Sequence, residues 1–295
     1  MPERAWTVGD ALDWTIGFLG DKGIEQPRLS AEWLLSAATG LSRVRLYTEF
    51  ARPLSAEERA RLRESVKRRA TGEPLQYVTG EMPFRHIVVH VRQGVFIPRP
   101  ETEVLVDVVL EHLRAVDPAR RLVADLCTGS GAVALSVASE DRAARVVASD
   151  LSADAVEVSS ANAERLGVGD RVMVSLGDLF APLDPSLKGD LAVVVANPPY
   201  IPSADVPDLA EEILGFEPHL ALDGGPDGLD TARRIMRDAV EWLAPGGMLA
   251  MELDERRVKD AVNEMREWYE GVSAVSDLTG RDRIATGVRS QERTA

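Results

Sequence analysis

The run Asn197-Pro198-Pro199-Tyr200 has residue types and spacing suited to holding a flat amino group. It follows directly on the apolar run 191–196, which predicts a buried strand. Because proline has no N–H and cannot continue a strand ladder, the chain must leave the sheet here, and its carbonyls have no local competitor. A backbone carbonyl and the Asn197 side-chain oxygen can accept the two hydrogens of an NH₂ group, and Tyr200 can stack on its plane.

Such an arrangement serves a particular chemistry. The nitrogen of an amide or aromatic amine is a poor nucleophile, since its lone pair is shared with a π-system. Two fixed N–H bonds aim this nitrogen at an electrophilic methyl group and favour the positive charge that develops on it. We expect Asn197, Pro198 and Tyr200 to be catalytic and to contact the substrate together with Pro199, with no strong base needed. His219 is nearby in sequence, and we interpret it as a surface histidine rather than a base.

A glycine loop follows another predicted strand, in the run Asp125-Leu126-Cys127-Thr128-Gly129-Ser130-Gly131. Its glycines permit a tight turn and a close approach of a ligand, and the following helix offers free N–H groups to an anion. Asp150 stands at the end of the next predicted strand, where a carboxylate can accept both hydroxyls of a ribose. The order of strand, loop, helix and acid indicates an adenosine cofactor.

The loop alone leaves the cofactor open, because Gly129-x-Gly131-x-x-Ala134 also satisfies the dinucleotide fingerprint. Asp125 favours S-adenosylmethionine, since a carboxylate there suits an ammonium and a sulfonium but repels a pyrophosphate. Asp178, after the third predicted strand, either accepts the adenine amino hydrogen or caps a turn. We interpret Cys127 as a small apolar filler, because nothing near it in sequence would activate a thiol.

The elements that position these residues fall into a helical and an alternating part. Apolar spacing predicts a helix from Val8 to a stop at Gly23, a second between an N-cap at Ser30 and Gly40, and a third from a capping box at 55–58 to Gly72. Basic residues share one face of the third helix, which is either a solvated face or a docking surface for an acidic or RNA-bearing partner. They are Arg59, Arg63 and Lys67, widened by Arg61, Arg68 and Arg69.

The rest of the chain predicts a doubly wound α/β domain. A β-hairpin is expected from residues 86–91 and 95–97 around a turn at Gln93-Gly94, with a helix starting after Pro100. Strands are then expected at 121–126, 145–149, 171–176, 191–196, 247–253, 272–276 and 283–288. They predict a mostly parallel seven-stranded sheet with ligands at its carboxyl edge. The expected domains are 1–84 (helical), 85–99 (hairpin linker) and 100–295 (α/β).

Composition narrows the partners and the compartment. With 48 acidic and 34 basic residues the formal charge is −14, so the average surface repels nucleic acid and anionic lipid. A single cysteine gives no intrachain disulfide, and His86 and His90 have no third ligand in sequence, so no metal is expected. The start has no signal pattern, and no apolar run reaches the ~18 residues of a membrane helix. We expect a cytoplasmic protein without a membrane anchor.

With these residues in place, the sequence resembles class I methyltransferases acting on planar amino groups, which include adenine-N6 and cytosine-N4 DNA enzymes and protein glutamine-N5 methyltransferases. Four further segments are similar to the glutamine-N5 enzymes, the HemK/PrmC family. They are the Gly-Glu-Pro-Leu-Gln-Tyr run at 72–77 with Thr79-Gly80, the Phe-Ile-Pro-Arg-Pro-Glu-Thr-Glu run at 96–103, the loop 216–229 and the segment 277–283. The resemblance covers nearly the whole chain.

This resemblance implies a Rossmann-like class I fold with a small N-terminal recognition domain. It also implies methylation of the glutamine amide in the Gly-Gly-Gln motif of peptide chain release factors, with S-adenosylmethionine as donor. Cys127 stands where the family usually has glycine, and Leu179 where an aromatic residue can cover adenine, which concerns affinity more than activity. The expected cofactor contacts are Asp125, Cys127, Thr128, Gly129, Ser130, Gly131, Asp150, Leu151, Asp178, Leu179 and Asn197.

Other interpretations stay open at this point. The same chemistry could serve another amide or amine, in a biosynthetic peptide or a nucleobase, although the charge of −14 disfavours nucleic acid. A cofactor-binding scaffold without turnover and a dehydrogenase are weaker alternatives. We expect a monomer. The glycines at 224, 225 and 228 indicate either a mobile flap over the substrate or an exposed turn.

Overall fold

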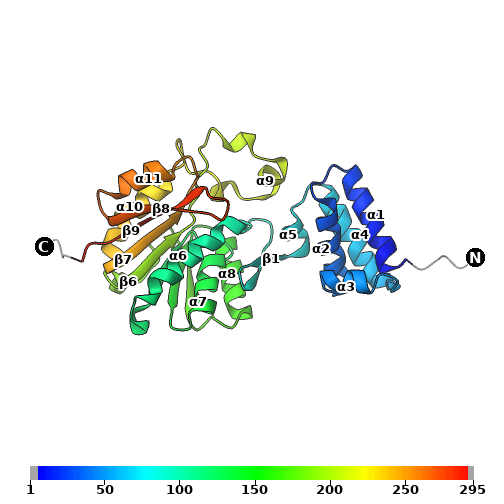
Figure 1. Ribbon diagram of the computed structural model, residues 1–295, viewed down its shortest axis with the longest axis horizontal. Helices are drawn as coiled ribbons and strands as arrows, with labels where there is room; N and C mark the ends of the chain where they lie inside the picture. Colours follow the sequence, from blue (N-terminus) through cyan, green and yellow to red (C-terminus); the bar gives the residue numbers. More distant parts are fainter. Residues whose placement is uncertain (1–5, 292–295) are drawn as a thin grey trace, which may run out of the picture. The chain divides into compact units, whose positions relative to one another are not determined.

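The computed structural model describes residues 6–291 and divides into two compact units (Figure 1). One unit comprises the helical residues up to Glu81 together with the segment Ala210–Phe216. The other comprises Met82–Leu209 and the chain from Glu217 onward. Each unit is described below by itself.

The first unit is a bundle of short helices. Its elements are α1 (Val8–Asp21), α2 (Pro27–Thr39), α3 (Arg43–Thr48), α4 (Ala56–Ala70), α5 (Leu75–Thr79) and, from the later segment, α9 (Glu211–Phe216). The predicted capping box of α4 is confirmed, since Ser55 Oγ accepts from Glu58 N while the Glu58 carboxylate accepts from Ser55 N. The predicted N-cap Ser30 is wrong, because α2 begins at Pro27, and proline is favoured in a first helical turn.

Leucines and other aliphatic side chains hold this bundle together. Leu12, Leu19, Leu34 and Leu46 are almost fully buried in one cluster, so the apolar stripes of the helices face inward. Arg69, only 4% exposed, forms an ion pair with Glu212 of α9 at 3.1 Å. This pair explains why α9 groups with the helical unit despite its distance along the chain.

The second unit begins with a small hairpin, which differs from the prediction. Its strands are β1 (Glu81–Phe84) and β2 (Ile87–His90), so the turn lies at Arg85 and His86, where Arg85 has a left-handed φ of 51°. The predicted strand at 86–91 is thus confirmed as β2, but the predicted partner at 95–97 forms no strand. Val95 and Ile97 are instead buried in the interior outside any strand, which explains why their sequence resembles a strand.

A seven-stranded sheet forms the centre of this unit. Its strands are β3 (Leu122–Leu126), β4 (Arg145–Asp150), β5 (Val172–Leu176), β6 (Leu191–Ala196), β7 (Leu243–Glu252), β8 (Glu270–Ser276) and β9 (Asp282–Val288). They lie in the order β5-β4-β3-β6-β7-β9-β8, and only the pairings with β9 are antiparallel. The predicted mostly parallel, seven-stranded fold is confirmed. The predicted start of β7 at Gly247 is wrong, because the strand already begins at Leu243 and includes Pro245 and Gly246.

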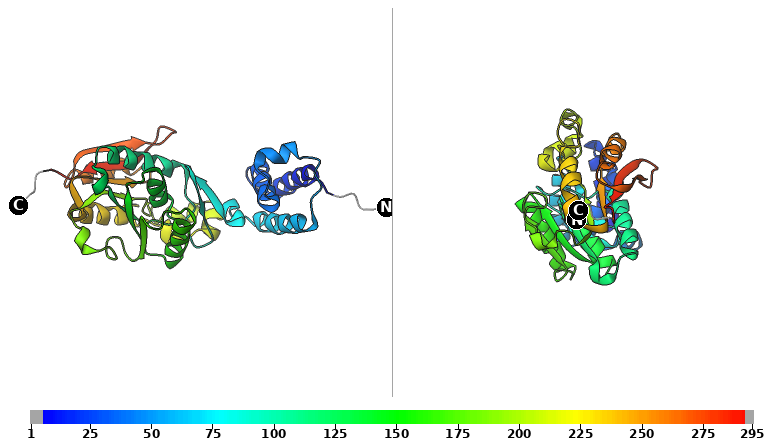
Figure 2. Two further views of the ribbon diagram at one scale, coloured as in Figure 1. Left: turned by 90° about the horizontal axis from the view of Figure 1, so that it is seen from below. Right: turned by 90° about the vertical axis from the view of Figure 1, so that its left-hand side faces the viewer.

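Helices cover both faces of the sheet (Figures 1 and 2). The α-helices are α6 (Glu103–Arg114), α7 (Ala132–Glu140) and α8 (Ala153–Arg165) on one face, and α10 (Asp230–Trp242) and α11 (Val258–Met265) on the other. Short 3₁₀ turns complete the unit: η1 (Pro100–Thr102), η2 (Pro118–Arg120), η3 (Pro185–Leu187), η4 (Val206–Asp208) and η5 (His219–Ala221). Strand β6 is buried at every position, as its unbroken apolar run predicts. No helix among residues 6–291 has the length and apolar character to cross a membrane.

Candidate active site

The strand order reverses between β3 and β6, which places three predicted site segments at one edge of the sheet. β3 has β4 on one side and β6 on the other, all parallel. The glycine loop after β3, Asp150 at the end of β4 and Asn197 after β6 therefore meet at the carboxyl edge. In open α/β sheets this reversal point is where a ligand binds.

The Asp125 side chain holds the glycine loop in place through two hydrogen bonds. Its carboxylate is 1% exposed, and its Oδ2 accepts hydrogen bonds from Thr128 Oγ1 at 2.6 Å and Ala134 N at 3.1 Å. Burial raises the pKa of Asp125 to about 7, against the opposing effect of these hydrogen bonds, and the charge of Asp150 adds to the rise. Within the described residues, Oδ1 accepts no hydrogen bond, so this oxygen is available to a cationic ligand group.

The Asp150 side chain, at the end of β4, binds the glycine loop to this strand. Its Oδ2 accepts from Gly129 N at 2.8 Å, and its Oδ1 accepts from Ser152 N at 2.9 Å. Burial raises the pKa of this carboxyl, while the backbone hydrogen bonds act in the opposite direction. Each carboxylate oxygen has more than one lone pair, so ribose hydroxyls can still be accepted. The ribose contact of Asp150 stays a prediction.

Two non-glycine residues of the site adopt the left-handed backbone region. Cys127 has φ of 58° and Leu179 has φ of 49°, conformations that are strained for side chains with a Cβ. Cys127 stands where the resemblance expects glycine, so its φ gives a physical reason for glycine there. Burial and the nearby carboxylates of Asp150 and Asp125 raise the pKa of the Cys127 thiol far above its usual range. The thiol is therefore protonated, which supports its interpretation as a filler.

The loop has features that fit the amino-acid end of S-adenosylmethionine. A Cβ built on Gly129 would meet no atom within 4 Å, so open space lies against the loop backbone. Ser130 Oγ is buried and has no hydrogen-bond partner among residues 6–291, which leaves it ready for one. The free Oδ1 of Asp125 suits the ammonium group, and the N-terminus of α7 suits the carboxylate. The residues present thus fit this cofactor.

The residues predicted to contact adenine follow the carboxyl ends of β4 and β5. Asp178 forms an ion pair with Arg234 at 2.6 Å, so its side chain does not cap the adjoining turn. Leu151 is 56% exposed, whereas Leu179 is 6% exposed and packs in the core with its carbonyl accepting from Ser149 Oγ. Leu151 therefore offers the more open apolar surface. The cofactor contacts of Asp178, Leu151 and Leu179 stay predictions.

The Asn-Pro-Pro-Tyr corner leaves β6 at the point predicted. Asn197 Nδ2 donates to Thr102 Oγ1 at 3.3 Å, which leaves its Oδ1 for another donor. The carbonyl of Pro198 accepts no hydrogen bond from the described residues. Tyr200 packs against the core of the sheet, and burial raises the pKa of its phenol, so it stays protonated. The corner thus presents two free acceptors.

The loop after the corner is packed rather than open. A Cβ on Gly224 would lie 2.7 Å from the Pro199 carbonyl oxygen, and one on Gly228 would collide with the Tyr200 carbonyl oxygen. Both glycines are buried, so for these two positions the structure supports neither a mobile flap nor an exposed turn. Their function is to let the loop backbone touch the corner. His219 lies exposed in η5, as its interpretation as a surface histidine predicts.

Sequence reasoning missed three buried polar residues beside the site. Asn162 of α8, fully buried, donates to the carbonyls of Ser130 and His90 at 3.0 Å, so it ties the glycine loop to β2. Thr102 and Glu252, 3% and 2% exposed, adjoin Asn197. For Asn162 and Glu252 the only signal was a polar residue in a small-residue helix or at the end of an apolar strand, and Thr102 lies in the family-like segment 96–103. None of these signals reveals the partner.

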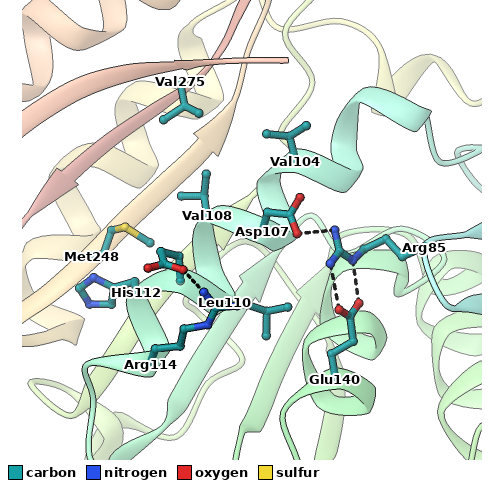
Figure 3. Close-up of a pocket in the computed structure, with 11 residues that line it drawn as sticks. Arg85, Val104, Asp107, Val108, Leu110, His112, Arg114, Glu140, Met248 and Val275 are labelled. Carbon is teal, nitrogen blue, oxygen red and sulfur yellow. Dashed lines mark hydrogen bonds and ion pairs between the residues drawn. The ribbon is translucent and has the colours of Figure 1, made fainter. Parts of the chain in front are cut away.

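A separate hollow lies along α6 and contains none of the predicted site residues (Figure 3). Arg85 reaches from the hairpin turn to Asp107 at 2.8 Å and to Glu140 at 2.7 Å. Figure 3 shows Val104, Val108 and Val275 as its apolar lining. The ion pairs hold the hairpin against α6 and α7, so we assign this hollow a structural rather than a catalytic character.

The fold and the site together define a class I methyltransferase. The "Methyltransferase small domain" family matches residues 86–226. Among solved structures, the hMettl16 catalytic domain, crystallised with the MAT2A 3'UTR hairpin 6, aligns with a TM-score of 0.56 at 13% identity, covering 70% of this chain and 76% of that one. At this identity the likeness concerns the fold alone.

Sequence comparisons identify the family within this class. The "PrmC N-terminal domain" family matches residues 10–80. The "Release factor glutamine methyltransferase" of Geobacter sulfurreducens is 43% identical over 96% of this chain and 96% of its own length. That of Moorella thermoacetica is 42% identical over 97% and 100%. The chain therefore belongs to the release factor glutamine methyltransferase family and is a methyltransferase that uses S-adenosylmethionine, which confirms the resemblance inferred from the sequence.

Proposed function

We propose that this enzyme transfers a methyl group from S-adenosylmethionine to the side-chain amide nitrogen of the glutamine in the Gly-Gly-Gln motif of peptide chain release factors. Asn197 Oδ1 and the Pro198 carbonyl accept the two amide hydrogens. The observation that carries this assignment is that both oxygens are free of partners in the described chain, while Asn197 Nδ2 is already bound to Thr102. A rigid pair of acceptors matches an NH₂ group, which has two hydrogens to donate.

The Asn-Pro-Pro-Tyr corner compensates for the low nucleophilicity of the amide nitrogen. S-adenosylmethionine, when bound, supplies a methyl group made electrophilic by the sulfonium. Asn197 and Pro198 hold the amide nitrogen in line and stabilise the positive charge that grows on it, so that positioning replaces a strong base. Tyr200 and Pro199 bound the plane of the amide and exclude water. The nitrogen takes the methyl and then releases one proton to solvent, leaving a neutral N-methyl amide and S-adenosylhomocysteine.

The glycine loop would hold the cofactor. Asp125 Oδ1 would accept from its ammonium group, while Ser130 and the first N–H groups of α7 would donate to its carboxylate. Asp150 would accept the ribose hydroxyls, and Leu151 and Leu179 would cover the adenine. This assignment is supported by the buried, unsatisfied Ser130 hydroxyl and by the open space beside Gly129.

The helical unit would grip the protein substrate through the basic face of α4, defined as Arg59, Arg63 and Lys67. All three are exposed and stand four residues apart, so they share one face. Within residues 6–291, the side chains of Arg59 and Arg63 form no ion pair, unlike Arg68 and Arg69. Lys67 lies 4.0 Å from Glu64, so the charges that this face offers to an acidic patch of a release factor are those of Arg59 and Arg63. We further propose a monomer that works in the cytoplasm without direct nucleic-acid contact.

Mass spectrometry of a purified release factor tests this function. After incubation with enzyme and S-adenosylmethionine, we expect one added methyl group on the glutamine of the Gly-Gly-Gln motif and none when that glutamine is replaced. We expect Asn197→Ala to lower kcat roughly 100-fold, as loss of a positioning contact does, and to leave the dissociation constant for the cofactor unchanged. No methylation by the wild-type enzyme would refute the substrate. Equal losses of kcat and cofactor affinity would show that Asn197 supports the fold instead.

A further inference from the structure

We propose that Thr102 and Glu252 form a hydrogen-bond relay that fixes which end of the Asn197 amide faces the substrate. The inference rests on the proposed function and adds two positioning residues to it. An asparagine amide has an oxygen and a nitrogen of nearly equal size, and a half-turn exchanges them. Only the oxygen can accept a substrate N–H. The corner therefore needs a partner that selects one orientation.

The fold brings these residues together from three separate segments. Ala196 of β6 pairs with Met251 of β7, so Asn197 and Glu252 are the next residues on adjoining strands. Thr102 comes from η1, which follows the hairpin. Its Oγ1 lies 3.3 Å from Asn197 Nδ2, and Thr102 favours the charged form of the Glu252 carboxyl, which is buried beside it.

The direction of the relay follows from the number of hydrogens. An ionised carboxylate has none to donate, so the single hydrogen of the Thr102 hydroxyl goes to Glu252. The Thr102 oxygen can then only accept, and the sole donor of the Asn197 side chain is Nδ2. Asn197 Oδ1 consequently faces away from Thr102. The charge on Glu252 thus determines the orientation of an amide that it does not touch.

Thr102 and Glu252 of the relay are both buried. Thr102 is 3% and Glu252 is 2% exposed, so water does not compete freely for their hydrogen bonds. Glu252 Oε2 is buried and has no partner within the described part of the chain, an arrangement that is costly for a carboxylate. A residue kept only for stability would be better replaced by an apolar one. An unsatisfied acid beside a substrate-binding corner indicates function.

The surroundings of Glu252 give the relay a dependence on pH. Burial and the charge of Glu101 raise the pKa of Glu252 to about 7, while Thr102, Arg283 and Arg99 act in the opposite direction. Burial and the charge of Glu252 also raise the pKa of the Tyr200 phenol, which stays neutral. When Glu252 is protonated it can donate to Thr102, which then donates to Asn197 and selects the reversed amide. Methyl transfer should therefore decline as the pH falls through about 7.

The test compares Thr102→Val, Thr102→Ser and Glu252→Gln. Valine keeps the shape of threonine without the hydroxyl, so we expect kcat for release factor methylation to fall roughly 10- to 100-fold, with an unchanged dissociation constant for S-adenosylmethionine. Serine keeps the hydroxyl and should restore most of the activity. Glutamine can donate or accept, so Glu252→Gln should lower kcat about 10-fold and abolish the decline in activity below pH 7.

An NMR measurement tests the relay without turnover. In ¹⁵N-labelled wild-type enzyme, the Asn197 side-chain NH₂ signal should shift with pH around 7, and in Glu252→Gln it should not. Equal activity of the valine and serine variants, or an unchanged acid limb in Glu252→Gln, would overturn the relay. So would an Asn197 signal that does not respond to pH. A wild-type enzyme that leaves the release factor unmethylated would instead refute the proposed function, while the NMR result would still decide the relay.

Discussion

Replacing Asp125 by asparagine should stabilise the cofactor-free enzyme and weaken cofactor binding. Thr128 Oγ1 and Ala134 N both donate to Oδ2 of the carboxylate. An asparagine can place its single oxygen at that position and keep both hydrogen bonds. Its NH₂ group then takes the place of the free Oδ1. It presents a donor instead of an acceptor to the ammonium of S-adenosylmethionine. The substitution therefore preserves the loop and changes the charge and the group that would contact the ammonium.

The size of the effect follows from the pKa of Asp125, which burial raises from 3.8 to about 7. At 1.36 kcal/mol per pKa unit, this difference corresponds to roughly 4 kcal/mol. Because the pKa is raised in the folded state, the carboxyl contributes stability at a pH below about 4, and this contribution is lost as the pH rises through about 7. Above that pH the ionised acid destabilises the cofactor-free fold. Asparagine, which does not ionise, avoids this cost.

Thermal unfolding at pH 5 and pH 8 and calorimetric titration with S-adenosylmethionine test this reasoning. We expect Asp125→Asn to unfold at a higher temperature than the wild type at pH 8, with a smaller gain at pH 5. The dissociation constant for the cofactor should rise at least about 10-fold, as for the loss of a charge-assisted contact. As a control, Asp184→Asn alters an exposed acid that keeps its hydrogen bond from Ser186 N and should change neither quantity. A variant less stable at pH 8, or one with unchanged cofactor affinity, would refute the reasoning.

Three further predictions concern backbone and surface. Cys127→Gly should keep full activity and alter unfolding free energy by less than about 1 kcal/mol, since relief of a left-handed backbone offsets added chain entropy; a large loss of activity would contradict a filler role. Gly228→Ala should abolish activity and lower the melting temperature more than Gly189→Ala, which also has positive φ but faces open space; equal effects would exclude the clash with Tyr200. Arg59→Glu with Arg63→Glu should raise KM for the release factor about 10-fold without changing cofactor affinity, whereas an unchanged KM would exclude docking there.

The sheet and its two motifs could be predicted because their signals are local. The run 191–196 matches β6, since a strand buried on both faces needs apolar residues throughout. The two prolines after it force an exit from the sheet wherever the strand lies in the fold. The glycine loop after Asp125 could also be predicted, because glycines and an acid directly after a strand are typical of few structures other than a ligand-binding loop.

Features that depend on contacts distant in sequence could not be predicted. Thr102 and Asn197 are separated by 95 positions, and Asn197 and Glu252 by 55. The local sequence around each residue gives no indication of its partner. The left-handed φ of Cys127 was equally hidden, since residue type predicts such a backbone only for glycine and asparagine-like side chains. The run 95–97 was mistaken for a strand because burial alone selects the same apolar residues.

In the proposed mechanism, one corner of the chain holds a flat NH₂ group between two oxygens. A crystal structure with S-adenosylhomocysteine and a peptide containing Gly-Gly-Gln tests it most directly. We predict that the glutamine amide nitrogen lies within about 3 Å of both Asn197 Oδ1 and the Pro198 carbonyl oxygen, with the cofactor sulfur beside it. A peptide bound with this nitrogen directed to other atoms, or with those two oxygens paired inside the protein, would contradict the proposed role of the corner.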